Sequence, residues 1–209
     1  MNETGKTFTF LGAGVAALLI AFAVAGREQQ YDVQSQVGKQ LNEFEVEAPR
    51  SLRIVKLDPE TSQLREFEVA EQDGVWSIPS KQSYPADAID QMAEAATCLM
   101  NREILRVQSE SAQDHVDLGV VDPLAAESSA DPEGAGTRVV MKDGSEEVLV
   151  DMIIGKEVKD ADDQRYVRKA TQDVVYVVEL DPEKLTTDFE EWIEDDLLQL
   201  NTFDMRRIF

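Results

Sequence analysis

The sequence predicts an α+β protein that begins with a single transmembrane helix and continues as antiparallel strand meanders, each closed by a helix. Three observations support this prediction. The first is an uncharged apolar stretch at residues 8–26. The second is a series of segments that alternate apolar and polar residues, with hairpin turn signals such as Asp73-Gly74 between them. The third is the placement of two amphipathic helical patterns, each after a group of strands.

The apolar stretch would form a helix about 28 Å long, close to the hydrocarbon thickness of a bilayer. A secretory signal peptide is the alternative, because Ala23-Val24-Ala25 matches a cleavage site and cleavage would follow Ala25. The stretch exceeds the usual hydrophobic region of a signal peptide, so we favour a membrane anchor. Gly12 and Gly14 begin a G-x-G-x-x-A pattern, but the apolar run continues without a βαβ context, which excludes a dinucleotide-binding turn.

Charge on either side of this stretch sets the expected orientation. Residues 1–7 carry Lys6 and the amino terminus, and no excess of positive charge follows residue 26. The positive-inside rule therefore predicts a single-pass protein of the cell membrane, with residues 1–7 as a cytoplasmic stub and residues 27–209 outside the cytoplasm. Residues 27–43 are polar and rich in Gln, and we interpret them as a juxtamembrane linker.

The formal net charge of the chain is −22. Such a charge repels nucleic acid and anionic headgroups, so we expect no nucleic-acid partner. A water-exposed acidic surface accounts for it, although a basic partner would also be attracted. Cys98 is the single cysteine, which excludes an intrachain disulfide, and its apolar helical surroundings predict a small buried side chain.

Residues 44–124 are predicted to form a first α+β half, and residues 137–209 a second one, with a flexible loop of small residues at 125–136 between them. The expected strands cover residues 51–57, 64–70, 75–78, 104–108, 137–142, 147–153, 165–169 and 174–180. The first helix follows Pro85, with an apolar face of Ile89, Met92, Ala93, Ala96, Leu99 and Met100. A second helix is expected from about Asp188, with Trp192 on its apolar side.

After the apolar stretch, the chain carries in order the segments DGVWSI, YPADAIDQM, HVDLGVVDP, MIIGKEV, RYVRK, VVYVVE and FEEWIEDDLLQL. This order resembles the bacterial family catalogued as domain of unknown function 4340, over about residues 51–200. The resemblance implies a membrane-anchored, extracytoplasmic α+β protein with no established activity. Members are often encoded beside ABC-type transporter components of the gliding-motility auxiliary kind. The resemblance therefore also implies an accessory role and a membrane-protein partner of the ABC-transporter type.

The last residues of the sequence, 202–209, carry Phe203, Met205, Ile208 and Phe209. Exposed apolar edges invite pairing with another chain, so this segment is predicted to form an edge strand or to dock against a partner. Members of the family that the chain resembles are commonly longer.

The sequence predicts no catalytic residue and no cofactor-binding residue. Gly155-Lys156 lacks the other residues of a P-loop, and a two-histidine metal site is excluded because His115 is the single histidine. Trp76 is expected to pack in the core. Arg165, Arg168 and Lys169 are predicted to be cross-strand ion-pair partners. The one candidate for a surface cation site consists of Asp160, Asp162 and Asp163, which lack the glycine and the closing glutamate of an EF-hand.

From these observations we expect a non-enzymatic, membrane-anchored extracytoplasmic protein that is an accessory or scaffold module of an ABC-type transport or gliding-motility-like complex. Two alternatives stay open. One is a secreted ligand-binding protein released by cleavage after Ala25. The other is a hydrolase that uses a pair of acidic residues, although nothing distinguishes one pair among the many carboxylates.

Overall fold

The computed structural model describes residues 33–58, 61, 63–127 and 133–193. The chain divides into two compact units, residues 1–35 and 36–209, and every strand of the described part lies in the second unit. The predicted transmembrane helix at residues 8–26 lies outside the described residues, as do the stub before it and the segment 202–209. Among the helices that are described, none has the length and apolar character needed to cross a membrane.

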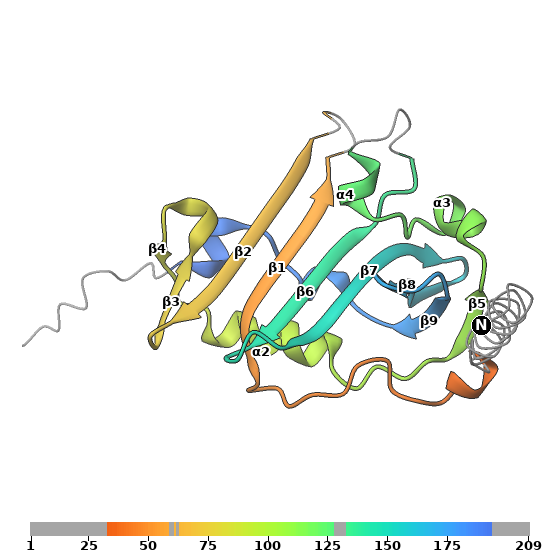
Figure 1. Ribbon diagram of the computed structural model, residues 1–209, viewed down its shortest axis with the longest axis horizontal. Coiled ribbons are helices and arrows are strands. Elements are labelled where there is room, and N and C mark those ends of the chain that lie inside the picture. The colour runs from red at the N-terminus through yellow and green to blue at the C-terminus, as the bar shows by residue number, and fades with distance from the viewer. Residues whose placement is uncertain (1–32, 59–60, 62, 128–132, 194–209) are drawn as a thin grey trace, which may run out of the picture. The chain divides into compact units, whose positions relative to one another are not determined.

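The strands form one nine-stranded antiparallel sheet in the order β4-β3-β2-β1-β6-β7-β8-β9-β5 (Figure 1). The strands are β1 (Pro49–Leu57), β2 (Leu64–Gln72), β3 (Val75–Ile78), β4 (Tyr84–Pro85), β5 (Arg106–Ser109), β6 (Thr137–Asp143), β7 (Val148–Val158), β8 (Ala161–Lys169) and β9 (Val175–Glu179). The helices are α2 (Ile89–Leu99), α3 (His115–Leu118) and α4 (Pro123–Ala126), and the described 3-10 turns are η1 (Val33–Gln36), η2 (Pro79–Lys81), η3 (Ala112–Asp114), η4 (Pro182–Lys184) and η5 (Phe189–Trp192).

The predicted fold of two similar α+β halves is wrong, because both groups of strands belong to one continuous sheet. β1 of the first group pairs with β6 of the second group. β5 follows α2 in the sequence, yet it pairs with β9 at the edge of the sheet. Each meander alone would leave a row of unpaired backbone groups on its outer strand, and joining the two meanders satisfies those groups.

The predicted second closing helix is also wrong within the described residues, because residues 189–192 form the short 3-10 turn η5. Asp188 begins this turn, because its side chain accepts a hydrogen bond from the backbone N–H of Glu190. Trp192 at the end of the turn is fully buried, packs against Phe67 of β2 with ring centroids 5.2 Å apart, and donates from Nε1 to the carbonyl of Thr186. A single large side chain therefore fastens residues 186–192 to the sheet.

Apolar side chains on one face of the sheet line up across four strands. Register places Leu52 of β1 directly opposite Val69 of β2 and Met141 of β6, and Met141 opposite Val150 of β7. All four side chains are buried. This alternation along each strand is the pattern expected when one face of an antiparallel sheet meets a covering layer.

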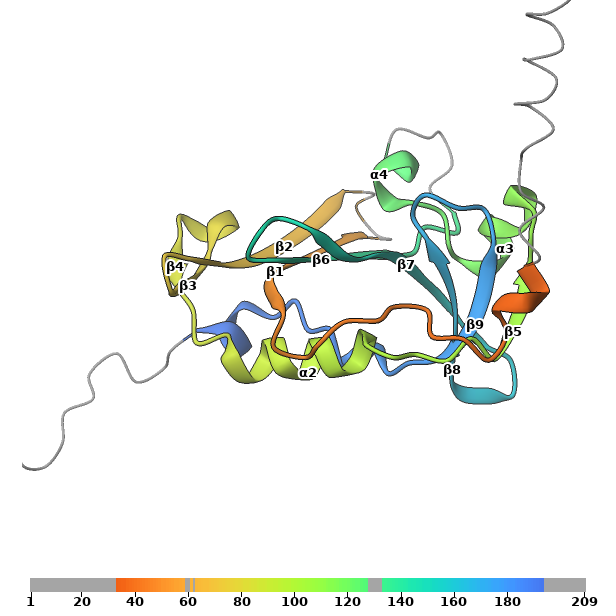
Figure 2. The same ribbon diagram turned by 60° about the horizontal axis from the view of Figure 1, so that its bottom comes forward.

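Helix α2 covers this apolar face, and α4 lies on the opposite face (Figure 2). The helix buries Met92, Ala95, Ala96, Cys98 and Leu99. Ile89 and Ala93, which the apolar pattern assigned to the buried face, are exposed instead. The reason is position, because Ile89 begins the helix and Ala93 lies one turn later on the same outward side.

Candidate functional site

Two arginines, on the strands that flank β7, point to the sheet face opposite α2. Register pairs Ile153 of β7 directly with Arg138 of β6 and with Arg168 of β8. The three side chains therefore share one face, with Ile153 between the two guanidinium groups. Asp151 of β7 lies on this face as well, two residues before Ile153. We call Arg138, Arg168, Asp122 and Asp151 the arginine cluster.

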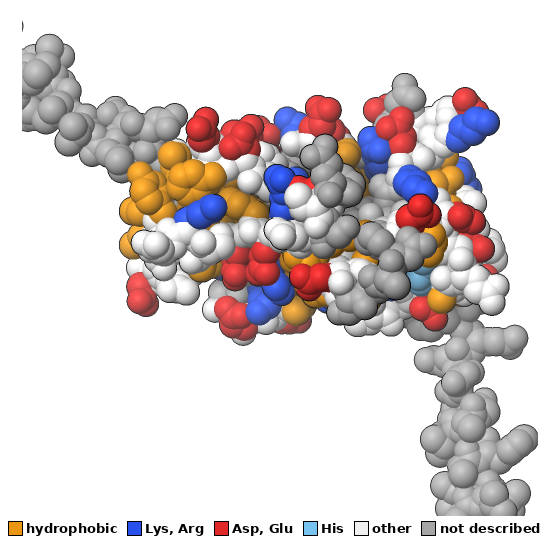
Figure 3. All heavy atoms as spheres, turned by 90° about the horizontal axis from the view of Figure 1, so that it is seen from above, with side chains coloured by type: hydrophobic (Ala, Val, Ile, Leu, Met, Phe, Trp, Pro, Cys, Tyr) orange, Lys and Arg blue, Asp and Glu red, His pale blue; other side chains and the backbone are white. Residues whose placement is uncertain are grey.

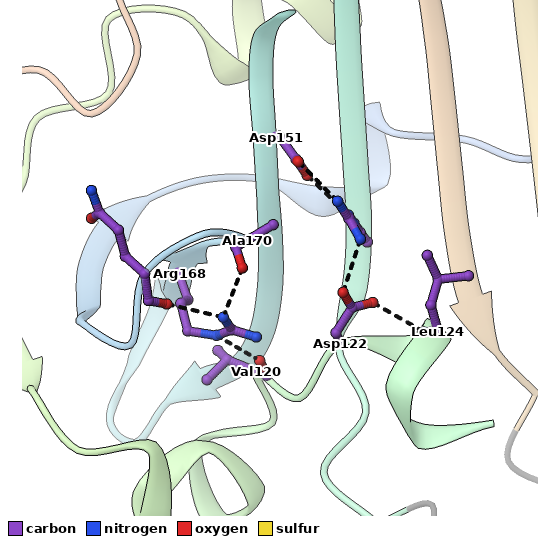
Figure 4. Close-up of polar contacts among 8 residues, drawn as sticks. Val120, Asp122, Leu124, Asp151, Arg168 and Ala170 are labelled. Atoms are coloured by element: carbon purple, nitrogen blue, oxygen red, sulfur yellow. Dashed lines mark hydrogen bonds and ion pairs between the residues drawn. The ribbon is translucent and has the colours of Figure 1, made fainter. Parts of the chain in front are cut away.

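Arg138 holds two carboxylates at once (Figure 4). Its Nε and one terminal nitrogen donate to the two oxygens of Asp151 at 2.9 and 2.8 Å, and its other terminal nitrogen donates to Asp122 at 2.8 Å. The hydrogen bonds to Asp151 raise the pKa of Arg138. The second oxygen of Asp122 accepts from the backbone N–H of Leu124 and so begins α4. One carboxylate thereby connects the sheet to the helix above it.

Arg168 is buried, at 7% exposure, and bonds to backbone instead of to carboxylates. Nε donates to the carbonyl of Val120 at 3.1 Å, and one terminal nitrogen donates to the carbonyls of Ala170 and Gln172 (Figure 4). Burial lowers the pKa of Arg168. The predicted ion pair is confirmed for Arg165, which lies 2.9 Å from Glu157 on the facing strand. For Arg168 the prediction is wrong, because its guanidinium bonds to backbone carbonyls.

Residues 118–122 pass over the face that carries the arginine cluster. Val120 packs there with Ile153 and Val175 in a buried group. Gly155 permits this close approach, because a Cβ at that position would lie 2.5 Å from the carbonyl oxygen of Leu118. Gly119 has a φ of +71°, which favours glycine. The segment HVDLGVVDP is therefore a strap that the sheet holds through glycine contacts and arginine hydrogen bonds.

Two polar residues near the arginine cluster, Lys156 and His115, also bond to the chain's own backbone. Lys156, which follows Gly155, donates from Nζ to the carbonyl of Asp117 at 2.9 Å, so this pair supports the strap and not a phosphate. His115 is buried, and its Nε2 lies 2.8 Å from the carbonyl oxygen of Asp173. Chemically, the hydrogen bonds named above all go to the chain's own groups, and the carboxylates of Asp122 and Asp151 share one guanidinium.

A recess lies on the other side of the sheet, beside α2. We call it the acidic groove; its volume is about 630 Å³, and it is lined by Asp90, Ala93, Glu94, Thr97, Cys98, Arg102, Asp181 and Lys184. Lys184 binds Glu94 at 3.1 Å across the groove. Smaller hollows continue from it past Glu190 and Glu191 of η5.

Cys98 lies at the inner wall of the acidic groove. Its side chain is 7% exposed, which confirms the predicted burial, and Sγ donates to the carbonyl of Asp181 at 3.2 Å. Burial raises the pKa of the thiol to about 11. A protonated thiol is a poor nucleophile, so the geometry favours packing.

A second recess, which we call the apolar groove, lies on the other flank of α2. Its volume is about 420 Å³, and its apolar lining includes Val46, Trp76, Ile89, Met92 and Ala93. Trp76 is only half-buried here, so the expectation of core packing is wrong for this side chain. The ion pair of Arg50 and Glu71, at 2.9 Å, lies at the rim. The two grooves share Ala93.

Hydrophobic side chains also gather over the end of the molecule formed by η2 and β4, whereas acidic and basic side chains alternate over the rest of that view (Figure 3). Tyr84 of β4 and Phe189 of η5 pack edge to face at this end, with centroids 5.5 Å apart. These rings close the end of the sheet against the segment that carries Trp192.

The candidate cation site falls in and after the turn between β7 and β8. Asp160 lies in this turn with a φ of 63°, and the side chains of Asp160 and Asp163 are exposed. The side chain of Asp162 lies outside what is described. Within the described residues, no group of three or more His, Cys, Asp or Glu side chains is placed to hold a metal ion.

Sequence reasoning missed Arg138 and the backbone role of Arg168. A signal for Asp122 was present, because Asp122-Pro123 is the start of a helix with proline at its first position. The partners of Arg138 could not be predicted from the sequence. Asp151 comes close to it only because β6 pairs with β7, and Asp122 only because the strap crosses this face of the sheet.

Comparison with known proteins gives one family. The model of a family described as Domain of unknown function (DUF4340) matches residues 76–209, which is more than half of the chain. No curated protein and no solved structure matches the chain.

Proposed function

The chain belongs to the DUF4340 family, and on that premise we propose that it is a non-enzymatic accessory or scaffold protein of an ABC-type transport or gliding-motility-like complex, located outside the cytoplasm. The observation that carries the proposal is that the two arginines under the strap bond within the chain, while the recesses are at the surface. The arginine cluster binds the chain's own carboxylates and carbonyls, whereas the recesses beside α2 lie open at the surface.

A small-molecule site usually combines an enclosed apolar pocket with a few convergent polar groups. In the described residues the buried polar groups that converge lie under the strap, whereas the charged side chains of the acidic groove lie at an open surface on the opposite face of the sheet. Buried convergent chemistry and accessible volume are thus separated. That separation supports binding to another macromolecule through a surface and disfavours the hydrolase alternative.

Purification of the tagged full-length chain from chemically crosslinked cells tests this proposal. We expect the chain in the membrane fraction, together with ABC-type permease or ATPase subunits at near-stoichiometric amounts identified by mass spectrometry. A tagged exported protein of similar net charge is the control for charge-driven capture. A chain that begins at Gly26 and is recovered alone from the soluble extracytoplasmic fraction would instead establish the secreted alternative.

A further inference from the structure

The outward face of α2 separates two recesses of different polarity. On one flank the apolar groove presents Trp76 and Ile89. On the other flank the acidic groove and its continuation present Asp90 and the glutamates of η5. Ala93 lines both grooves, so at this position only a methyl group lies between them, and the larger side chains of Asp90 and Thr97 lie on the acidic side.

The apolar flank is unusually exposed for this chain. Ile89 is 66% exposed, the highest value among the exposed large hydrophobic side chains that the structure describes. It lies with the half-buried Trp76 of β3 in the lining of the apolar groove. Contiguous exposed apolar surface beside polar residues is typical of a protein-binding surface.

Two cations line the acidic groove, Arg102 and Lys184, and Arg102 donates to the carbonyl of Thr97 at 2.6 Å. Lys184 is already paired with Glu94, and the hydrogen bond to Glu94 raises the pKa of Lys184. Asp90, Glu190 and Glu191 take part in none of the ion pairs found in the described part of the chain. Their carboxylates therefore face solvent beside an apolar groove and attract a partner that carries positive charge.

We propose that this face of α2 is the docking surface for a basic amphipathic helix of a partner protein, a proposal that rests on the scaffold function and names the chemistry of its partner. The partner's apolar side chains enter the apolar groove, and its Lys or Arg side chains lie over Asp90, Glu190 and Glu191. α2 has 11 residues, so the matching segment spans about three turns, or about 16 Å.

The small side chain of Ala93 allows the two helix axes to approach to about 8 Å, the short end of the usual range. Groove-bound helices of this kind place anchors on one face at helical spacing. A second copy of this chain is a poor occupant, because it would bring the same uncompensated carboxylates into contact. Anionic lipid is repelled by the same charges.

The test uses the full-length chain and a fluorescein-labelled amphipathic peptide of Leu and Lys, LKKLLKLLKKLLKL, followed by fluorescence anisotropy. The matched probes are the peptide with Glu in place of Lys and a Leu/Lys peptide of the same composition scrambled to have no apolar face. We expect binding of the amphipathic Leu/Lys peptide and at least tenfold weaker binding of both matched probes, because contact requires both charge and an apolar face.

Two variants locate the binding. Ala93→Trp fills the space between the grooves, and Asp90→Asn/Glu190→Gln/Glu191→Gln removes the three carboxylates assigned to contact the partner. Each is expected to weaken binding by about tenfold or more, the scale of a central contact. The matched controls are Ala112→Trp in η3 and Glu103→Gln/Glu110→Gln/Asp117→Asn, which are exposed positions that line neither groove. Equal weakening by the control triple, or unchanged binding by Ala93→Trp, would overturn the proposal.

The same variants separate this proposal from the scaffold function. Recovery of the membrane partner by Ala93→Trp at the wild-type level would reject the docking surface and leave the scaffold function standing. Recovery of no partner by the wild-type chain, with peptide binding still dependent on Ala93 and the acidic flank, would reject the ABC-type complex and retain the docking surface. Urea unfolding of each variant checks that it is folded.

Discussion

The two faces of the sheet use charge in opposite ways. Under the strap, Arg138 and Arg168 are turned inward and bonded to the chain's own carboxylates and carbonyls. Beside α2, Asp90, Glu190 and Glu191 are turned outward toward water. The comparison teaches that, in this strongly acidic chain, Arg138 and Arg168 serve to hold the strap against the sheet. The chain's surplus carboxylates are then left for contacts with other molecules.

Removal of the Arg168 side chain should have the largest effect on stability. Arg168→Ala leaves the carbonyls of Val120, Ala170 and Gln172 without their donor. The carbonyl of Val120 is the buried acceptor of the three, and an unsatisfied buried acceptor costs about 1–3 kcal/mol. Because the removed side chain also leaves unfilled space beneath the strap, we expect the free energy of unfolding to fall by about 3 kcal/mol, measured by urea denaturation. The control is Arg53→Ala, which breaks an exposed pair with Glu66 and should cost at most about 1 kcal/mol. Equal losses for the two variants would contradict the role assigned to Arg168.

Addition of one methyl group under the strap should have the next largest effect. In Gly155→Ala the new Cβ would lie 2.5 Å from the carbonyl oxygen of Leu118 and 2.6 Å from Val120. The strap must then move away from the sheet, at a cost of about 1–3 kcal/mol. Gly144→Ala is the matched control, because the nearest atom to its Cβ would be in Arg50 at 3.5 Å, an ordinary contact. An equal change in urea midpoint for the two variants would show that the strap is not held closely.

The buried thiol beside α2 should respond to pH as a group with a raised pKa. The pKa of Cys98 rises to about 11 from an ordinary value near 9, so its stabilising contribution is present below pH 9 and lost as the pH rises toward 11. At pH 8 the native chain should react with iodoacetamide about 100-fold more slowly than the urea-unfolded chain, from the thiolate fraction alone. Comparable rates in the two states would mean that the groove opens to expose the thiol.

Neutralisation of the outward acids should leave stability almost unchanged. Glu190→Gln/Glu191→Gln alters two exposed side chains of η5 whose carboxylates are outside the ion pairs of the described residues. We expect the free energy of unfolding to change by no more than about 0.5 kcal/mol, as for other surface substitutions. A loss near that of Arg168→Ala would place these carboxylates among the structural charges and remove the contrast between the faces. Urea denaturation measures both variants in parallel.

Local signals in the sequence located the secondary structure well. The strand predicted at residues 75–78 coincides with β3, and the Asp73-Gly74 turn before it has positive φ at both residues, as the hairpin signal requires. The pair of Arg165 with Glu157 follows from strand alternation and a short hairpin. Predictions of this kind succeed because the residues that decide them lie within a few positions of one another.

Signals that depend on distant segments were missed. The exposure of Ile89 depends on which side of α2 the sheet covers, whereas the apolar helical pattern had placed it on the buried face. Arg168 was assigned an ion pair from its charge, whereas the strap, 48 positions away in sequence at Val120, offered a carbonyl. Burial removed competing water, so backbone acceptors satisfied the guanidinium.

The sequence by itself determined the strands, the hairpin turns, α2, the burial of Cys98 and the acidic surface, because alternation, turn chemistry and composition are local or additive properties. Only the tertiary structure decided that β1 joins β6 and β5 joins β9, which turns two predicted halves into one sheet. It also decided that Arg138 meets Asp122 and Asp151. These outcomes depend on how free strand edges and buried polar groups find partners across the whole chain, and backbone pairing at long range is not encoded in any single segment.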